Sequence, residues 1–449
     1  MEQYDLIILG GGPAGYVAAI EAGKAGKQVL LFEAQQQGGV CLNAGCIPTK
    51  TLLYTAKNYA HMVSGDVKGL GAMSFNLDYS KALAWKDTVI NTYRNGILQL
   101  FNKAGVRMVQ ARGRLLDRST VEADGKVYKA HTIMITTGSR PAIPSIEGLK
   151  ESRSVVTSTE LLQLESIPKH LCVVGAGVIG LEFAALFSQL GSQVTVIEML
   201  DHIAPMVEPE MRKALTQSLK KRITFHISAA VQKIDGDRVY FTKKGKELSI
   251  EADTILIAAG RKANIEDIGL KEAGVKTSKG FILVNERLET SAPRIYAFGD
   301  VVGTSLFAHS ASRMAEIAVK VYSGDRTAAM KYNAIPWAIY TWPEVAGCGY
   351  TEAQADELGM KVVTATAQLR TSARYFAENG NTPGLVKLVA AQEDKKIIGF
   401  QMIGSNCSEM LWGASMAINL GLHAKDIVET VFAHPTISEV IREAALQLL

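Results

Sequence analysis

The chain contains few cysteines and has no strong excess of charge. Five cysteines among 449 residues are too few for the disulfide framework of a small secreted domain. Lys and Arg number 48 against 44 Asp and Glu, so the composition gives no basic footprint for nucleic acid. No uninterrupted apolar run could span a bilayer, and the first strand begins by Tyr4 without a leader-like segment. We therefore expect a cytoplasmic protein with no nucleic-acid or membrane partner.

Two of the five cysteines, Cys41 and Cys46, stand close together in a glycine-containing stretch, residues 38–50. On a regular helix, Cα atoms five residues apart are about 8.6 Å apart, whereas a disulfide tolerates at most about 7 Å. If these cysteines bridge, the turn must be distorted, and Gly45 gives the backbone that freedom. Such strain would make the bridge easily reduced, which favours a redox-active pair.

Two other interpretations of this cysteine pair have to be weighed. The remaining cysteines, Cys172, Cys348 and Cys407, stand singly, so no second ligand pair completes a zinc site. We therefore expect no metal. Two unrelated core cysteines would explain the spacing if the motif stood alone, but its neighbours in the sequence argue against this.

A nucleotide-binding unit precedes the cysteines. Residues 4–9 form a short apolar run typical of a buried parallel strand, and a small apolar helix and a second strand, 28–32, follow it. The turn between the first strand and the helix fits G-x-G-x-x-G, and the second strand ends at an acid. Such glycines let a helix N-terminus approach a pyrophosphate, and the acid can bind a ribose hydroxyl. These residues are Gly10, Gly12, Gly15 and Glu33.

The same pattern recurs 165 residues later, which predicts a second dinucleotide site rather than a chance cluster of glycines. Its residues are Gly175, Gly177, Gly180 and Glu198. A carboxylate at this point favours a free ribose 2′-hydroxyl and repels a 2′-phosphate. Residues 199–202 after it include no arginine, so NAD is favoured over NADP. Both units close with an apolar strand and a glycine, Gly138 and Gly260.

The rest of the chain divides into further elements. We expect a helix from the cysteine stretch to about residue 59, another over 80–104, strands within 106–136, and a proline-marked linker at 141–144. A strand-like segment, 292–300, ends at Asp300, which is placed to hold a sugar-like hydroxyl, and a helix is expected over 305–322. Alternating segments after residue 332 predict an antiparallel sheet with helices.

A histidine near the C-terminus, His434, is followed by a proline that fixes the backbone, and Glu439 could orient its imidazole. On local grounds alone a satisfied structural histidine is the commoner interpretation.

These elements predict an α/β protein with two Rossmann-like dinucleotide-binding domains and a C-terminal α+β domain. The predicted boundaries are 1–145 for the first part of one dinucleotide-binding domain, 146–263 for the other, 264–330 for the second part of the first or a central domain, and 331–449 for the C-terminal domain. The family resemblance described next implies that these are the FAD-binding, NAD-binding, FAD-binding or central, and interface domains.

Over essentially its whole length the chain resembles the flavoprotein pyridine nucleotide-disulfide oxidoreductases, and among them the dihydrolipoamide dehydrogenase branch. The motifs that carry the resemblance are the 38–50 stretch, the two glycine turns, the Phe-Gly-Asp at 298–300 and the segment 434–439. The resemblance implies FAD on the first turn with Glu33 and Asp300, NAD on the second with Glu198, and a homodimer. It also implies that protein-bound dihydrolipoyl groups are oxidised while NAD is reduced.

The resemblance further implies roles for single residues. Cys46 would lie against the flavin, and Cys41 would exchange with the substrate. Lys50 and Glu182 would form an ion pair beside flavin and nicotinamide. His434, oriented by Glu439, would be the acid–base catalyst contributed across a dimer interface.

The implied partner is a lipoyl-bearing acyltransferase or lipoyl carrier protein of a 2-oxo acid dehydrogenase or glycine cleavage system. One departure is Phe432, where related chains often have histidine. The alternatives are an NADPH-dependent reductase of another small disulfide, a non-catalytic component of a large complex, and a flavin oxidase with incidental cysteines.

Overall fold

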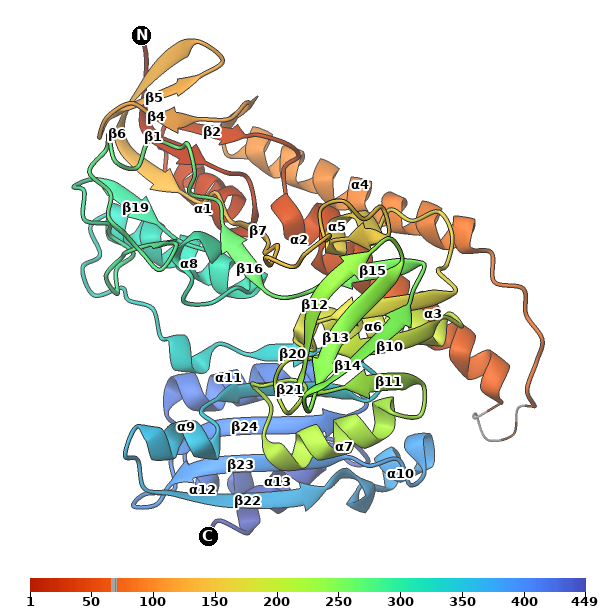
Figure 1. Ribbon diagram of the computed structural model, residues 1–449. Helices are drawn as coiled ribbons and strands as arrows, with labels where there is room; N and C mark the ends of the chain where they lie inside the picture. Colours follow the sequence, from red (N-terminus) through yellow and green to blue (C-terminus); the bar gives the residue numbers. More distant parts are fainter. Residues whose placement is uncertain (66–68, 70) are drawn as a thin grey trace.

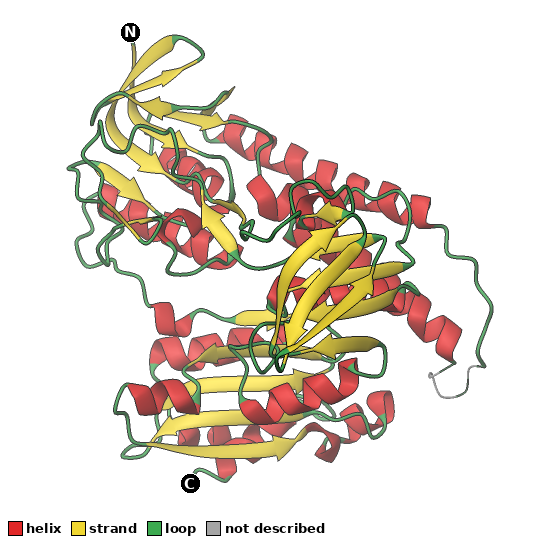
Figure 2. Ribbon diagram, viewed as in Figure 1, coloured by secondary structure: helices red, strands yellow, loops and turns green. Residues whose placement is uncertain are grey.

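A computed structural model describes residues 1–65, 69 and 71–449 (Figure 1). Three bodies follow one another from the N-terminal end of the molecule to the C-terminal end, and each is built on its own sheet with helices packed against it (Figure 2). The predicted class, α/β with two doubly wound units and a C-terminal α+β domain, is confirmed.

The first sheet is built around β1 (Glu2–Leu9), whose apolar residues 6–9 are fully buried because the sheet is covered on both faces. Helices α1 (Pro13–Lys24) and α8 (Ala308–Tyr322) pack together, and α4 (Tyr79–Lys103) lies beside them in the N-terminal body (Figure 1). Its strands, in spatial order, are β3 (Arg107–Gln110), β2 (Val29–Glu33), β1, β6 (Lys126–Ile135), β5 (Thr120–Ala123) and β4 (Arg114–Leu115), with β19 (Ile295–Ala297) also pairing with β6.

The second sheet is entirely parallel and repeats the strand–helix–strand order of the first. Its order is β11 (Ile223–His226), β10 (Gln193–Ile197), β9 (His170–Val174), β15 (Thr254–Ile257) and β8 (Val155–Val156). Its helices are α5 (Ser158–Leu161), α6 (Val178–Gln189) and α7 (Pro209–Leu219). An antiparallel sheet of β12 (Ala229–Asp235), β13 (Arg238–Lys243) and β14 (Lys246–Glu251) stands beside it.

Two small ribbons complete these bodies. Strands β7 (Ser139–Pro141) and β16 (Arg261–Ala263) pair antiparallel where the chain leaves the first sheet and where it returns from the second. The other ribbon joins β17 (Thr277–Ser278) to β18 (Phe281–Ile282).

The C-terminal body is one antiparallel sheet covered by helices. Its order is β20 (Trp337–Ile339), β21 (Glu344–Gly349), β24 (Ile397–Gly404), β23 (Leu385–Ala391) and β22 (Val362–Gln368). Its helices are α9 (Glu352–Glu357), α10 (Ala373–Asn379), α11 (Leu411–Leu420), α12 (Ala424–Glu429) and α13 (Glu439–Leu446).

Short 3-10 turns occur at several points along the chain. They are η1 (Asp300–Val302), η2 (Tyr332–Ala334), η3 (Leu369–Thr371) and η4 (Ser408–Met410).

Several predicted elements need correction. The helix expected from the cysteine stretch to residue 59 is two helices, α2 (Gly39–Ala44) and α3 (Cys46–Ser64), because the backbone at Gly45 leaves the helical region. The strand expected over 292–300 is only β19, since the chain turns before it and a 3-10 turn starts at Asp300. The helix expected over 305–322 starts at Ala308, and Pro141 lies in a strand rather than in a linker.

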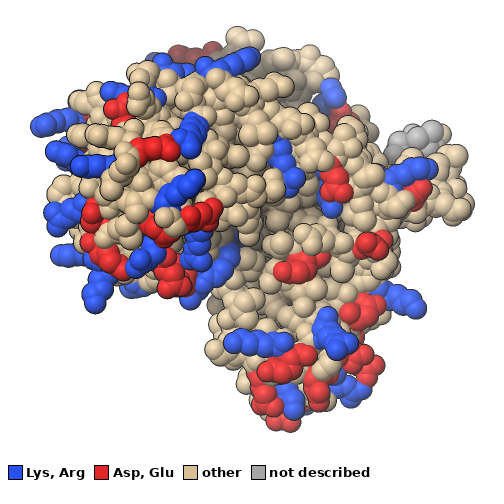
Figure 3. All heavy atoms as spheres, turned by 90° about the horizontal axis from the view of Figure 1, so that it is seen from above, with Lys and Arg blue, Asp and Glu red and all other residues tan. Residues whose placement is uncertain are grey.

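Lys and Arg side chains are interspersed with Asp and Glu on the face seen in Figure 3, as the balanced composition predicts. Among the described helices, none is long and apolar enough to cross a membrane.

Candidate functional site

Cys41 and Cys46 are joined by a disulfide across the break between α2 and α3, with Cα atoms 4.6 Å apart. The break is at Gly45, where φ is −150° and ψ is −111°. A Cβ at Gly45 would lie 2.9 Å from the carbonyl oxygen of Val40, so a side chain would not fit without movement. The predicted distorted turn is therefore present. Among the described residues, no three or more His, Cys, Asp or Glu side chains are grouped so that they could hold a metal ion.

The disulfide stretch rests directly on the first glycine turn. The N–H of Gly38 donates to the carbonyl oxygen of Gly11 over 2.8 Å. Gly39 has a φ of +59°, and a Cβ there would lie 2.6 Å from the Cα of Gly12. This close backbone approach brings the redox pair and the N-terminus of α1 together.

Two glycines of the first turn are required by neighbouring backbone. Gly10 has a φ of +106°, and a Cβ there would lie 2.4 Å from the carbonyl oxygen of Thr136. A Cβ at Gly15 would lie 1.7 Å from the carbonyl oxygen of Gly10, so this glycine lets α1 pack closely on β1. Gly12 caps α1 without any side-chain hydrogen bond, which leaves the N-terminal N–H groups of the helix open to an anion.

The second turn is built in the same way as the first. In it, two glycines are required by protein packing, and a third is not. Gly175 has a φ of +109°, and its Cβ would lie 2.5 Å from the carbonyl oxygen of Ala258. A Cβ at Gly180 would lie 2.0 Å from the carbonyl oxygen of Gly175. A Cβ at Gly177, the cap of α6, would meet no atom within 4 Å. Packing therefore does not require Gly177, and the open side of this helix end fits the close approach of a pyrophosphate.

The two predicted ribose acids are held in matching frames. One carboxylate oxygen of Glu33 accepts the N–H of Gly11 at 2.6 Å, and the other accepts that of Gln35 at 2.8 Å. Glu198 accepts the N–H of Ala176 at 2.6 Å and that of Leu200 at 2.8 Å. Each backbone bond fixes the carboxylate at the end of its strand and leaves further lone pairs for hydroxyl donors.

Asp300 starts η1 and is held by two residues that the sequence did not single out. Ser139 donates to its carboxylate over 2.5 Å, and the Nε atom of Arg261 lies 3.6 Å from the same oxygen. Arg261 also donates to the hydroxyl of Ser139 at 2.7 Å. Burial lowers the pKa of the Arg261 guanidinium, although Asp300 opposes this effect. Gly138 and Gly260 have φ values of +69° and +118° on either side of the ribbon formed by β7 and β16.

Lys50 and Glu182 form an ion pair of 2.8 Å between α3 and α6. Lys50 lies one helical turn after Cys46, so it is on the same side of α3 as the sulfur. The side chain of Glu182 is 5% exposed, and its second oxygen accepts the N–H of Tyr340 at 3.1 Å. The Lys50 ammonium also lies 4.6 Å from the centre of the Tyr340 ring, a cation–π contact. Tyr340, which the sequence did not indicate, thus brings the C-terminal body to this pair.

His434 and Glu439 are paired as predicted, with 2.8 Å between Nδ1 and a carboxylate oxygen. The pKa of Glu439 is lowered, first by the N–H of Thr436 and then by His434. The side chain of His434 is 76% exposed, so its Nε2 atom is accessible to a reactant. In Figure 1 the helix α13 lies at the base of the molecule, whereas α2 lies well above it. Within one chain the histidine and the disulfide therefore belong to separate bodies.

Of the predicted residues, the structure brings Cys41, Cys46, Lys50 and Glu182 together around the start of α3. The two glycine turns and their acids form two separate cradles that fit two dinucleotides. A reversible disulfide beside one such cradle can pass an electron pair between a thiol reactant and a bound redox cofactor.

Comparisons with known proteins agree with this geometry. The family described as "Pyridine nucleotide-disulphide oxidoreductase" matches residues 4–315, and its dimerisation domain matches residues 335–445. The chain is 36% identical to the dihydrolipoyl dehydrogenase of Bacillus subtilis over 99% of this chain and 96% of that protein. It is 37% identical to the dihydrolipoyl dehydrogenase of Thermus scotoductus over 99% and 97%.

The fold is also similar to those of solved structures over the whole chain. LpdA from Mycobacterium tuberculosis is similar with a TM-score of 0.90 at 25% identity, and all of both chains is covered. The flavoprotein disulfide reductase RclA from Escherichia coli, induced by HOCl and solved as a Cu(II) complex, has a TM-score of 0.88 at 26% identity, again over both whole chains.

Proposed function

The chain belongs to the pyridine nucleotide-disulphide oxidoreductase family, and we propose that it is a dihydrolipoyl dehydrogenase that reoxidises protein-bound dihydrolipoyl groups and reduces NAD. The observation that carries the proposal is the Cys41–Cys46 disulfide, which lies against one of two dinucleotide cradles. Full-length similarity to dihydrolipoyl dehydrogenases supports this substrate over another small disulfide.

The residues present fit both cofactors of this family. FAD would be held by the first glycine turn with Glu33 and Asp300, and NAD by the second turn with Glu198. Because Glu198 would present a carboxylate to the ribose and residues 199–202 include no arginine, the second site favours NAD over NADP. When bound, FAD accepts an electron pair from the reduced cysteines and NAD carries it away as hydride.

The chain's own residues account for the thiol chemistry. Glu439 holds Nδ1 of His434, so Nε2 is free to take the proton of a substrate thiol. The resulting thiolate attacks the sulfur of Cys41, and the bond to Cys46 breaks, with its electron pair going to Cys46. The second substrate thiol, after losing its proton, attacks the mixed disulfide, which releases the cyclic disulfide product and leaves Cys41 and Cys46 reduced. The Lys50–Glu182 pair lies one helical turn from Cys46, on the same side of α3.

The matched dimerisation domain supports a homodimer. We propose that each active site takes its cysteines from one subunit and His434 from the other, because the two lie in separate bodies of one chain. The finer assignments belong to the same proposal: a lipoyl-bearing acyltransferase or carrier protein as partner, a cytoplasmic location, and domain boundaries at 145/146, 263/264 and 330/331.

Steady-state assays test the proposal. The purified protein should oxidise dihydrolipoamide with NAD and should use NADPH and glutathione disulfide poorly in the reverse direction. Rapid reduction of glutathione disulfide by NADPH would instead identify the NADPH-dependent reductase. Activity with neither disulfide, together with rapid oxygen consumption, would identify a flavin oxidase.

A further inference from the structure

An extensive polar network outside the cysteine and dinucleotide sites surrounds Lys387, a residue of β23 in the C-terminal sheet. Its side chain is only 3% exposed, and its ammonium lies 3.2 Å from Glu208, 3.0 Å from Glu210 and 2.8 Å from Glu352. Burial alone would lower the pKa of Lys387, but the three carboxylates outweigh it and raise the pKa. The residue is therefore a permanent buried cation.

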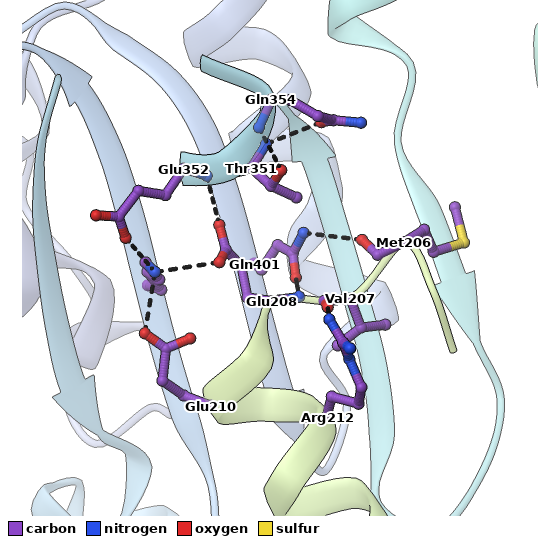
Figure 4. A network of polar contacts seen from close by, with 10 residues as sticks. Met206, Val207, Glu208, Glu210, Arg212, Thr351, Glu352, Gln354 and Gln401 are labelled. Carbon is purple, nitrogen blue, oxygen red and sulfur yellow. Dashed lines mark hydrogen bonds and ion pairs between the residues drawn. The ribbon is translucent and has the colours of Figure 1, made fainter. Parts of the chain in front are cut away.

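The network joins two bodies of the molecule, as Figure 4 shows. Glu208 and Glu210 stand at the start of α7 in the second body, whereas Glu352 starts α9 in the C-terminal body. Glu208 is the centre of the junction. One of its oxygens accepts the N–H of Glu352 at 2.7 Å, and its own N–H donates to the side chain of Gln401 at 2.8 Å. Gln401 also donates to the carbonyl oxygen of Met206 at 3.3 Å.

The segment fixed by this junction leads directly to the second dinucleotide cradle. Residues 199–208 connect Glu198 to α7, and both Glu198 and a residue in the middle of the segment are bonded to the glycine turn. Ala204 donates its N–H to the carbonyl oxygen of Ala176 at 3.0 Å, and the N–H of Ala176 donates to Glu198 at 2.6 Å. Ala176 stands between Gly175 and Gly177. The N–H of Val207 in turn donates to the carbonyl oxygen of Ala204 at 3.0 Å, so hydrogen bonds link the glycine turn to Val207, the residue directly before Glu208.

We propose that Lys387 is a positioning residue for the NAD site. Through Glu208 it fixes the 199–208 segment, and with it Glu198 and the glycine turn, against the dimerisation domain. The inference rests on the proposed function, because it takes the second cradle to be the NAD site. It implies that NAD affinity depends on a lysine in another domain that never touches the dinucleotide.

Loss of the lysine should uncouple the segment. With methionine at position 387, Glu208, whose side chain is 3% exposed, would keep its backbone bond to Glu352 but lose its cation. Loss of the lysine has two consequences: the buried carboxylate is left without its cation, and the ion pairs that hold the segment against the C-terminal body are lost, so the segment is expected to shift away from that body. The ion pairs are lost in the double variant as well. The adenosine side of the NAD site would then be less preorganised, which weakens binding without changing the thiol chemistry.

The test compares Lys387→Met, Lys387→Arg and Lys387→Met/Glu208→Gln with the control Lys361→Met. Lys361 is an exposed lysine that lines, together with Lys387, a cleft of about 590 Å³. The double variant removes both buried charges, so it tests the inference even where the single variant fails to fold. Three measurements are made on the FAD-loaded protein. Calorimetry gives the dissociation constant of NAD, and steady-state kinetics show whether a variant changes the KM for NAD or kcat. The third measurement is the rate at which dihydrolipoamide reduces the bound flavin in the absence of NAD.

We expect a roughly tenfold weaker NAD affinity and a matching rise in KM for Lys387→Met and for the double variant. Reduction by dihydrolipoamide should stay within twofold, Lys387→Arg should recover most of the affinity, and Lys361→Met should match the wild type. Unchanged NAD affinity in the double variant would overturn the inference. So would a loss in the rate of flavin reduction by dihydrolipoamide that equals the loss in NAD affinity. A wild-type protein that fails to bind NAD would overturn the proposed function and this inference with it.

Discussion

Of two alanine substitutions in the second glycine turn, one should weaken NAD binding with little change in stability, and the other should destabilise the fold. Gly177→Ala adds a methyl group where no protein atom lies within 4 Å, at the open end of α6. Gly180→Ala adds one 2.0 Å from the carbonyl oxygen of Gly175 and 3.2 Å from a methyl of Val173. The first should spoil the pyrophosphate site of a stable protein, and the second should destabilise the fold.

The magnitudes follow from these contacts. At Gly177 the entropy lost by the unfolded chain favours alanine by about 0.4–1 kcal/mol, whereas the helix cap favours glycine by about as much, so stability should change little. The methyl group would occupy the approach of the pyrophosphate, and we expect at least about a tenfold loss of NAD affinity, or about 1.4 kcal/mol. At Gly180 the helix must move off its strand, because backbone cannot yield as a side chain can, and about 3 kcal/mol or more is expected.

Calorimetry with NAD and thermal unfolding of the FAD-loaded protein separate the two effects. Gly177→Ala should keep its Tm within about two degrees and lose affinity, and Gly180→Ala should lose several degrees. Flavin content is the control, since neither residue belongs to the first cradle. Wild-type NAD affinity in Gly177→Ala would refute the assignment of this helix end to the pyrophosphate.

Three further predictions concern the two sulfurs, the choice of nicotinamide cofactor and the shared active site. After two-electron reduction, the long-wavelength absorption of a thiolate beside flavin should vanish in Cys46→Ser and persist in Cys41→Ser, and the reverse result would exchange the roles of the two sulfurs. The native protein should prefer NADH to NADPH, and Glu198→Ala with Met199→Arg should narrow that gap; equal use of both cofactors by the native protein would contradict the ribose argument. Homodimers of Cys41→Ser and of His434→Gln should each be nearly inactive, whereas the isolated heterodimer should regain activity at its one intact site; activity no higher than in the parents would mean that His434 acts within its own chain or is not the base.

Much of this architecture could be predicted from local sequence patterns. The glycine turns and the acids that end their strands depend on residues close in sequence, so the equal 165-residue offsets predicted two similar units, and the structure contains both. The sequence predicted that a Cys41–Cys46 disulfide requires a distorted turn, and the non-helical backbone at Gly45 provides this distortion.

The residues that the sequence missed act through long-range contacts. Ser139 and Arg261 meet Asp300 from segments more than 30 residues away, and no local pattern marks them. Lys387 is a single charge within an apolar strand, and two of its three carboxylate partners, Glu208 and Glu210, come from the second body. Such contacts depend on how the domains pack, which periodicity along the chain does not encode.

Anaerobic mixing of the FAD-loaded protein with dihydrolipoamide, followed by NAD, tests the central claim most directly. The account predicts rapid appearance of the long-wavelength thiolate–flavin absorption, loss of one disulfide per chain, and stoichiometric NADH formation once NAD is added. The account would be contradicted if NADH reduced the flavin normally but dihydrolipoamide did not react with the Cys41–Cys46 disulfide.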